Sequence, residues 1–319
     1  MAGATTTIDQ AGGSAATQGD LWGERARDWA EVLEGWNGWG IPLYRHILER
    51  VTVERGTGVL DMGCGAGRFC RIAADRGAHI SGLDATATFV RIARERIPAG
   101  EFRVGDIEHL PWPDNSFDVI TGFNSFIFAA NITGALREAR RVAREGGNVA
   151  ITVFGRPERC ESTSVFGSVG QLLPAQSGAG EGGPALHEVG TLETLASEAG
   201  LTPKEAGYVE LAEEYPNLDT FLRGYLAAGP IVSAIRTLGE EAVRDALTEG
   251  VRPLMTASGG VRFDDEYRYL IATKVRVNPV AAMINHQRRH VRQYSCEHVP
   301  DQPGRIRTSA LGISLSHQR

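Results

Sequence analysis

The feature that most constrains this 319-residue chain is the run Val-Leu-Asp-Met-Gly-Cys-Gly-Ala-Gly at residues 59–67. Apolar Val59 and Leu60 predict the end of a buried strand, Asp61 places a carboxylate at its carboxyl edge, and glycines at alternate positions predict a turn into a helix. Glycine reaches backbone angles that other residues avoid, and it lets a ligand lie against the main chain. The run therefore predicts a nucleotide-binding loop, with an ordinary tight turn as the alternative.

The order of the glycines separates two classes of cofactor. A dinucleotide-binding loop has the order Gly-x-Gly-x-x-Gly or Ala, with a pyrophosphate at the amino end of the following helix. Here Arg68 stands at the position of the third small residue, and the run reads Asp-x-Gly-x-Gly-x-Gly, with Gly63, Gly65 and Gly67. This order disfavours an NAD-dependent oxidoreductase, which we keep as an alternative function.

Two further acids follow predicted strands. Asp84 ends the predicted strand 78–84, and Asp106 follows the predicted strand 102–104. A carboxylate about 20 residues beyond the glycine loop is where a doubly wound fold binds ribose hydroxyls. The alternative is that each Asp caps the helix that follows it. Acids at three consecutive strand ends favour one shared ligand site.

The glycine run resembles the first motif of class I S-adenosylmethionine-dependent methyltransferases. Residues 110–120, Leu-Pro-Trp-Pro-Asp-Asn-Ser-Phe-Asp-Val-Ile, closely resemble the signature of the methyltransferase type 11 family, which includes ubiquinone and menaquinone methyltransferases. The resemblance covers roughly residues 58–154. It implies an α/β fold with a doubly wound, Rossmann-like, seven-stranded sheet. It also implies methyl transfer by in-line displacement from S-adenosylmethionine to O, N or C of a small-molecule acceptor, with S-adenosylhomocysteine as product.

The resemblance also implies site residues. Asp84 would hold the ribose, Asp106 the adenine amino group, and the backbone amide of Ile107 the adenine ring. The expected cofactor-binding residues are Trp22, Asp61, Gly63, Cys64, Gly65, Gly67, Asp84, Ala85, Asp106, Ile107, Phe123 and Asn124. The acceptor-side candidates, each with a structural role as its alternative and none assigned as catalytic, are Phe126, His187, Tyr215 and Arg223. No metal is expected, because the four cysteines lack paired metal-ligand spacing.

Outside the core, the chain predicts a cover, an insertion and two tails. Residues 1–19 are small and polar and predict a disordered start. Asp20 can cap a helix with an apolar stripe that includes Trp22, so 20–55 is expected to form a helical lid. The methyltransferase domain is expected over 56–275, with an acceptor-side loop and a helical insertion within 155–263. Residues 276–319 are basic and are expected to form a disordered tail.

Charge and hydropathy limit the partners. Residues 276–319 hold seven arginines and two acids, which leaves 26 basic and 37 acidic side chains in residues 1–275. This balance disfavours a nucleic-acid substrate, because phosphate binding relies on Lys and Arg. With no apolar stretch near the roughly 20 residues of a membrane span and no signal-peptide core, a cytoplasmic protein without a membrane partner is expected. The sequence does not predict an oligomeric state. A second alternative function is a non-catalytic protein that retains the cofactor pocket.

Overall fold

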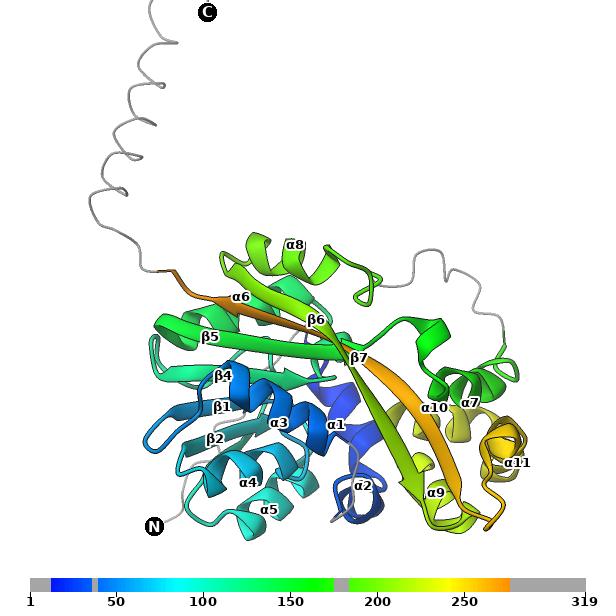
Figure 1. Cartoon of the computed structure of the whole chain (residues 1–319). Coiled ribbons are helices and arrows are strands. Elements are labelled where there is room, and N and C mark those ends of the chain that lie inside the picture. Colours follow the sequence, from blue (N-terminus) through cyan, green and yellow to red (C-terminus); the bar gives the residue numbers. More distant parts are fainter. Residues whose placement is uncertain (1–12, 36–39, 175–183, 276–319) are drawn as a thin grey trace, which may run out of the picture. The chain divides into compact units, whose positions relative to one another are not determined.

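The computed structural model describes residues 13–35, 40–174 and 184–275, and seven of its strands form one sheet (Figure 1). Their order is β3-β2-β1-β4-β5-β7-β6. Strands β1 to β5 pair in parallel, whereas β7 is antiparallel to both of its neighbours. The strands are β1 (Gly58–Met62), β2 (His79–Asp84), β3 (Glu101–Val104), β4 (Phe117–Phe123), β5 (Ala143–Phe154), β6 (Thr202–Tyr215) and β7 (Val261–Thr273). The predicted doubly wound seven-stranded sheet is confirmed.

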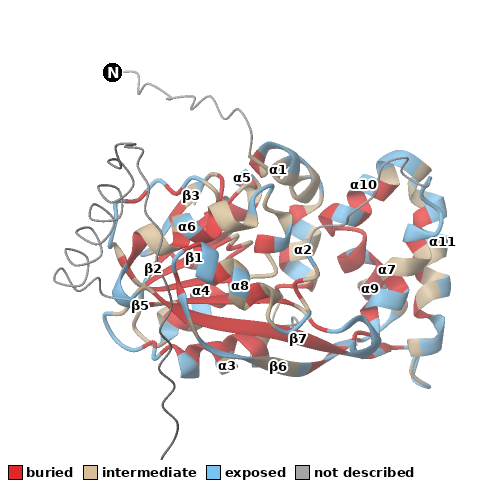
Figure 2. Cartoon of the chain, turned by 90° about the horizontal axis from the view of Figure 1, so that it is seen from above, coloured by how far each residue is buried: buried red, intermediate tan, exposed pale blue. Residues whose placement is uncertain are grey.

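Helices cover both faces of the sheet, and its inner strands are buried between them, whereas the edge strand β6 is largely exposed over its first half (Figure 2). Because successive strand residues point to opposite faces, Val59 and Val119 belong to one buried cluster, and Leu60 and Ile120 belong to the other. The first cluster includes apolar residues of α3 (Ile41–Arg50), α4 (Arg68–Asp75) and α5 (Ala87–Arg96). The second includes those of α6 (Ile132–Val142) and α8 (Thr191–Glu198). The near-continuous apolar strands are thus buried on both sides, as parallel sheets require.

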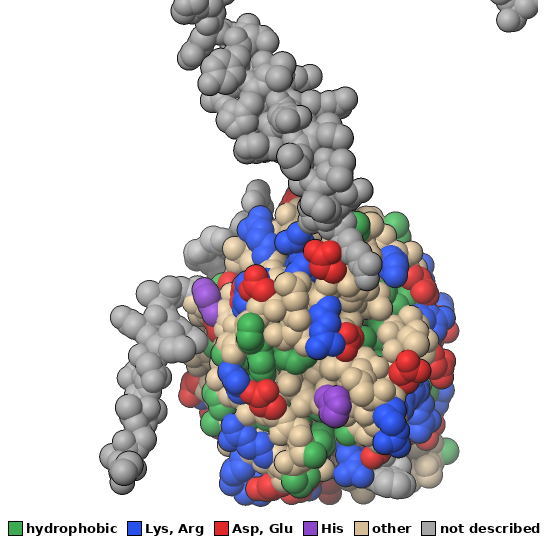
Figure 3. All heavy atoms as spheres, turned by 90° about the vertical axis from the view of Figure 1, so that its left-hand side faces the viewer, with side chains coloured by type: hydrophobic (Ala, Val, Ile, Leu, Met, Phe, Trp, Pro, Cys, Tyr) green, Lys and Arg blue, Asp and Glu red, His purple; other side chains and the backbone are tan. Residues whose placement is uncertain are grey.

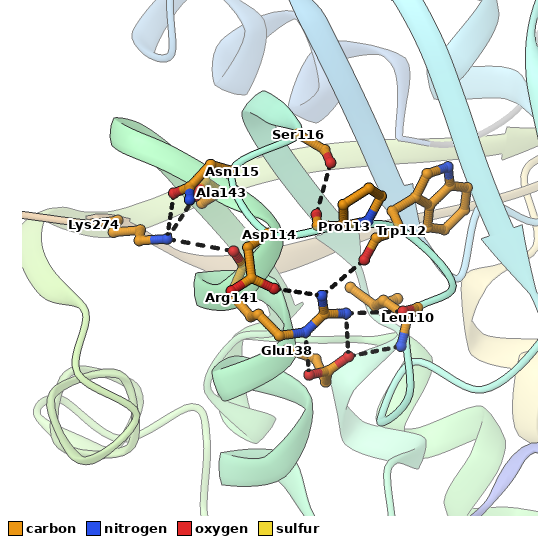
Figure 4. A network of polar contacts seen from close by, with 10 residues as sticks. All are labelled: Leu110, Trp112, Pro113, Asp114, Asn115, Ser116, Glu138, Arg141, Ala143 and Lys274. Carbon is orange, nitrogen blue, oxygen red and sulfur yellow. Dashed lines mark hydrogen bonds and ion pairs between the residues drawn. The ribbon is translucent and has the colours of Figure 1, made fainter.

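The signature at 110–120 forms a braced turn that leads into β4 (Figure 4). Arg141 of α6 donates to the carbonyls of Leu110 and Trp112, both at 2.8 Å, and it pairs with Asp114 at 3.0 Å and with Glu138 at 2.7 Å. At the other end of this turn, Lys274 Nζ donates to Asn115 Oδ1 at 2.8 Å. Asn115 has a φ of 56°, in the left-handed region that Asn tolerates. This family signature therefore has a structural role.

The last two strands continue past the rest of the sheet and carry a second group of helices (Figure 1). At the far end of this antiparallel strand pair, Tyr215 and Phe263 pack with Phe221 and Tyr225 in a separate apolar cluster. The helices are α7 (Ser162–Gly170), α9 (Leu218–Tyr225), α10 (Gly229–Leu238) and α11 (Glu240–Val251). Helices α9 to α11 occupy the expected insertion, between β6 and β7.

The amino-terminal cover consists of two helices, α1 (Ala15–Gly23) and α2 (Ala26–Val32). The predicted start at Asp20 is wrong: Asp20 lies within α1, and its carboxylate pairs with Arg236 of α10 at 2.5 Å instead of capping a helix. Arg25 likewise pairs with Glu240 of α11 at 2.6 Å. The cover and the late insertion are therefore joined across more than 200 residues of sequence. The expected disorder of residues 1–19 is wrong over 15–19, because these residues form the first turns of α1. Residues 1–12 and 276–319 lie outside the described residues.

Candidate cofactor and acceptor site

One cavity extends along the carboxyl edge of the parallel strands, where open α/β sheets bind ligands. Its lining follows the sheet order: Asp106 comes after β3, Asp84 ends β2, Phe123 ends β4, and Phe154 ends β5. Beyond them, Tyr267 of β7 and Glu213 of β6 also line it. The described helices α1, α2 and α9 contribute Trp22, Trp29 and Tyr225, so the cover and the insertion close the cavity.

The glycine loop between β1 and α4 is shaped for close approach. Gly63 and Gly65 have φ of 76° and 54°, and both line the cavity. A Cβ on Gly63 would lie 2.4 Å from Ser125 Cβ, and one on Gly65 would lie 2.2 Å from Glu34 Oε1. Gly67 is not among the described lining residues; it precedes α4 with a φ of 85° and packs against Ala93 of α5. Its role is to bring the helix close to its neighbour.

Sequence reasoning missed Glu34, which lies at the amino end of α4. Its carboxylate accepts hydrogen bonds from the amides of Ala66 at 2.9 Å and Arg68 at 3.2 Å, and Arg96 lies 3.3 Å away. Burial raises its pKa, although these amides and Arg96 oppose the shift. A dinucleotide fold places a pyrophosphate at this helix end, but here the chain's own carboxylate takes the position. The NAD alternative is therefore not supported.

The three acids at the strand ends are buried and hydrogen-bonded. Asp61 accepts from Thr121 Oγ1 at 2.7 Å, and burial raises its pKa to about 7. Asp84 accepts from the amides of Gly65 at 2.9 Å and Thr86 at 2.8 Å. Asp106 accepts from the amide of Glu108 at 2.8 Å. Asp84 thus holds the glycine loop against the turn at Thr86 that precedes α5. A carboxylate with one bond on each oxygen still has lone pairs for ribose hydroxyls.

Asn124 provides an independent test of whether a polar ligand fits. It lines the cavity just after β4, and its φ of 53° is in the left-handed region. Its side-chain Oδ1 and Nδ2 are both buried without a hydrogen-bond partner. Buried polar groups are nearly always paired. The orphaned amide therefore fits a cofactor that carries an amino-acid end, such as S-adenosylmethionine.

Most expected cofactor residues lie together along this cavity. Those that line it are Trp22, Asp61, Gly63, Cys64, Gly65, Asp84, Ala85, Asp106, Ile107, Phe123 and Asn124. The acids and glycines lie at the carboxyl ends of β1, β2 and β3 or in the loops that follow them, whereas Trp22 comes from the cover. Within the described residues, no group of three or more His, Cys, Asp or Glu side chains could hold a metal ion.

The acceptor-side candidates are mostly placed elsewhere. Phe126 is fully buried in the sheet core and packs against Gly122. Arg223 is exposed and pairs with Asp28 and Glu31 of α2, so it ties the cover to α9. His187 offers its carbonyl to Tyr208 Oη at 3.1 Å, and its side chain is not among the described cavity-lining groups. Tyr215 is buried next to the lining and donates to Glu213 at 2.9 Å.

The residues that line the cavity beyond the carboxyl end of β4 were not predicted. They are mainly aromatic, with one acid, and include Phe154, Phe166, Glu213, Tyr225 and Tyr267. A signal for Glu213 does exist in the sequence: Leu211, Glu213 and Tyr215 alternate on the inward face of β6, so the acid occupies a buried position. This alternation identifies Glu213 as buried only if the strand is known to continue as far as Tyr215.

Comparison with known proteins supports the same assignment. The family model described as a methyltransferase domain matches residues 60–151. Malonyl-[acyl-carrier protein] O-methyltransferase of Serratia marcescens is 37% identical over 118 residues, covering 35% of this chain and 46% of that protein. The enzyme of the same name from Erwinia pyrifoliae is 31% identical over 184 residues, covering 57% and 66%. The chain therefore spans about half to two thirds of the length of these relatives.

Among solved structures, phosphoethanolamine N-methyltransferase 2 of Haemonchus contortus, in complex with S-adenosyl-L-methionine, matches with a TM-score of 0.52. The identity is 17%, and the match covers 81% of this chain and 60% of that one. At this identity the match establishes the fold alone. The fold and the cavity define the class I S-adenosylmethionine-dependent methyltransferase domain. Within that class, residues 60–151 match the family model of a methyltransferase domain, and this part of the chain is similar to the methyltransferase type 11 family.

Proposed function

We propose that this protein transfers a methyl group from S-adenosylmethionine to a small-molecule acceptor by in-line displacement inside the cavity. The observation that carries the proposal is the continuity of that cavity. The cavity joins the acids and glycines at the carboxyl ends of β1, β2 and β3 to a largely aromatic end. The amino-terminal cover and the insertion close that end. Donor and acceptor can thus be held in one enclosure, which is what in-line transfer needs.

Four of the predicted cofactor residues have proposed roles that suit their positions. Asp84, beside the glycine loop, would hold the ribose hydroxyls, and Asp106, after β3, would hold the adenine amino group. The orphaned amide of Asn124 would bind the amino-acid end of the cofactor. The bound cofactor supplies a sulfonium methyl group. Trp22 packs edge-on against Trp29, with ring centroids 4.7 Å apart. On the cover side of the cavity, it would exclude water from the bound cofactor.

The lining favours a small and uncharged acceptor. Among the described lining residues, Arg68 is the only Lys or Arg, and it lies beside the glycine loop. On the face drawn in Figure 3, basic and acidic side chains are interspersed, with no gathering of basic ones. Nucleic-acid binding relies on gathered Lys and Arg. None of the described helices is both long enough and apolar enough to cross a bilayer.

Calorimetric titration with S-adenosylhomocysteine tests the proposal. We expect wild-type protein to bind it and to show no heat with NAD⁺. Asp84→Asn should weaken binding about tenfold or more, because it removes a charge-assisted hydrogen bond to ribose. Asp245→Asn, at an exposed position on α11, is the matched control. A well-folded wild-type protein that gives no heat with S-adenosylhomocysteine would refute the proposed function.

A further inference from the structure

A buried acid, Glu213, lines the proposed acceptor end of the cavity, and its hydrogen-bond partners within the described part of the chain are hydroxyl groups. Glu213 is 5% exposed. Its Oε2 accepts from Tyr215 Oη at 2.9 Å, and its Oε1 accepts from Tyr267 Oη at 3.2 Å. Within the described residues, no Lys or Arg forms an ion pair with it. A buried carboxylate without a cation is costly, so its place on the cavity surface points to a role with a ligand.

The surroundings of Glu213 indicate what it faces. Phe154, Phe166, Tyr225 and Tyr267 line the same end of the cavity, and the rings of Phe154 and Tyr267 lie 5.2 Å apart. Such walls suit a flat ring, which packs edge-on or offset against aromatic side chains. Acidic Asp265 lies close enough to influence Glu213, so a carboxylate or phosphate on the acceptor would meet like charges. The acceptor that fits is therefore aromatic and uncharged, with a hydrogen-bond donor for Glu213.

We propose that Glu213 binds the hydroxyl group of a phenolic acceptor and takes its proton as the methyl group is transferred. This inference rests on the proposed function. A bond forms between the phenol oxygen and the methyl carbon, and the sulfur–carbon bond breaks, with its electron pair remaining on sulfur. The hydroxyl proton passes to the Glu213 carboxylate. The positive charge of the sulfonium and the negative charge of the carboxylate disappear together, and Glu213 later releases the proton to water.

The ionisation of Glu213 supports this role. Burial raises its pKa to about 8, the charge of Asp265 adds to the shift, and the hydroxyls of Tyr215 and Tyr267 oppose it. Burial raises the pKa of Tyr225 of α9, and the charge of Glu213 adds to this shift. A base whose pKa lies near that of a phenol, about 10, can accept its proton more readily than an ordinary carboxylate can. Since the carboxylate must be ionised to act, the rate of methylation should rise with pH through this pKa and then level off.

The experiment compares two phenols of different acidity. Wild-type and Glu213→Gln proteins are given methyl-labelled S-adenosylmethionine with 1-naphthol or with the more acidic 4-nitrophenol. We expect the variant to lose about 100-fold in kcat with 1-naphthol. The loss with 4-nitrophenol should be much smaller, because that phenol ionises without help. The pH dependence of kcat/KM should flatten in the variant, while the affinity for S-adenosylhomocysteine should be unchanged.

Glu214→Gln is the matched control, because Glu214 is the exposed neighbour of Glu213 on β6. It should behave as wild type. Equal losses for the two phenols in Glu213→Gln would overturn the role in proton transfer. If neither phenol is methylated although S-adenosylhomocysteine binds, the inference fails and the proposed function stands. If S-adenosylhomocysteine does not bind, the proposed function fails as well.

Discussion

At the scale of single residues, the site depends on Gly65, whose missing side chain leaves room for the carboxylate of Glu34. Gly65 lies against the carboxylate of Glu34, which in turn bonds the amides of Ala66 and Arg68. The carboxylate is stabilised there by the partial positive charge at the amino end of a helix. The loop and the end of the cover are therefore one structural unit, formed by residues about 30 positions apart.

Gly65→Ala tests that unit. The new Cβ would lie 2.2 Å from Glu34 Oε1, on a backbone with a φ of 54°. We expect a loss of S-adenosylhomocysteine affinity and about 1–3 kcal/mol of stability for the strained backbone, with a further loss for displacing Glu34. Gly146→Ala is the matched control, since Gly146 has a φ of 81° and nothing within 4 Å of an added Cβ. Urea unfolding and calorimetry would measure both; equal stability losses in the two variants would contradict the clash.

At the scale of elements, the signature turn shows how a family motif positions a strand. Its two prolines, Pro111 and Pro113, favour an extended approach, but the fold of the turn depends on Arg141 from the helix that follows β4 (Figure 4). Three donor nitrogens of this guanidinium serve two carbonyls and two carboxylates. The planar fork of Arg suits this arrangement better than the single ammonium of Lys.

Replacing Arg141 should therefore cost stability. We expect Arg141→Ala to lower the free energy of unfolding by about 2 kcal/mol, because the carbonyls of Leu110 and Trp112 lose a charged donor. Arg141→Lys should recover only part of the loss. Arg137→Ala, at an exposed position on the same helix, should change stability by less than about 0.5 kcal/mol. Denaturant unfolding decides the matter: similar values for the two alanine variants would show that the turn does not need this bracing.

At the scale of the whole described molecule, the acceptor end depends on a core separate from that of the sheet. Phe221 of α9 is fully buried there, with its ring centroid 4.3 Å from that of Tyr225 and 5.4 Å from that of Tyr215. Tyr215 donates to Glu213, and Tyr225 lines the cavity. Packing in this cluster therefore supports the proposed acceptor site without reaching the glycine loop.

Phe221→Ala should separate the two ends of the cavity. The cavity left by a buried phenylalanine costs about 3–5 kcal/mol, and we expect faster hydrogen exchange in α9 to α11 than in β1 to β4. Methylation of 1-naphthol should fall more than S-adenosylhomocysteine affinity. Phe117→Ala, in the core of the sheet beside Trp112, is the control at a buried phenylalanine of the other cluster. Uniformly faster exchange across the described residues in Phe221→Ala would argue against separate cores.

The sequence by itself determined the cofactor end of this protein. Strand, glycine loop and acid are neighbours along the chain, and the carboxyl ends of parallel strands meet at one edge, so Asp61, Asp84 and Asp106 were predictable from local pattern and spacing. Only the tertiary structure decided the acceptor end. Glu213 and Tyr267 are brought together by the pairing of two long strands, and ion pairs such as Arg223 with Asp28 form between segments nearly 200 residues apart. Such contacts leave no periodic signal in either segment, because each depends on where the other one packs.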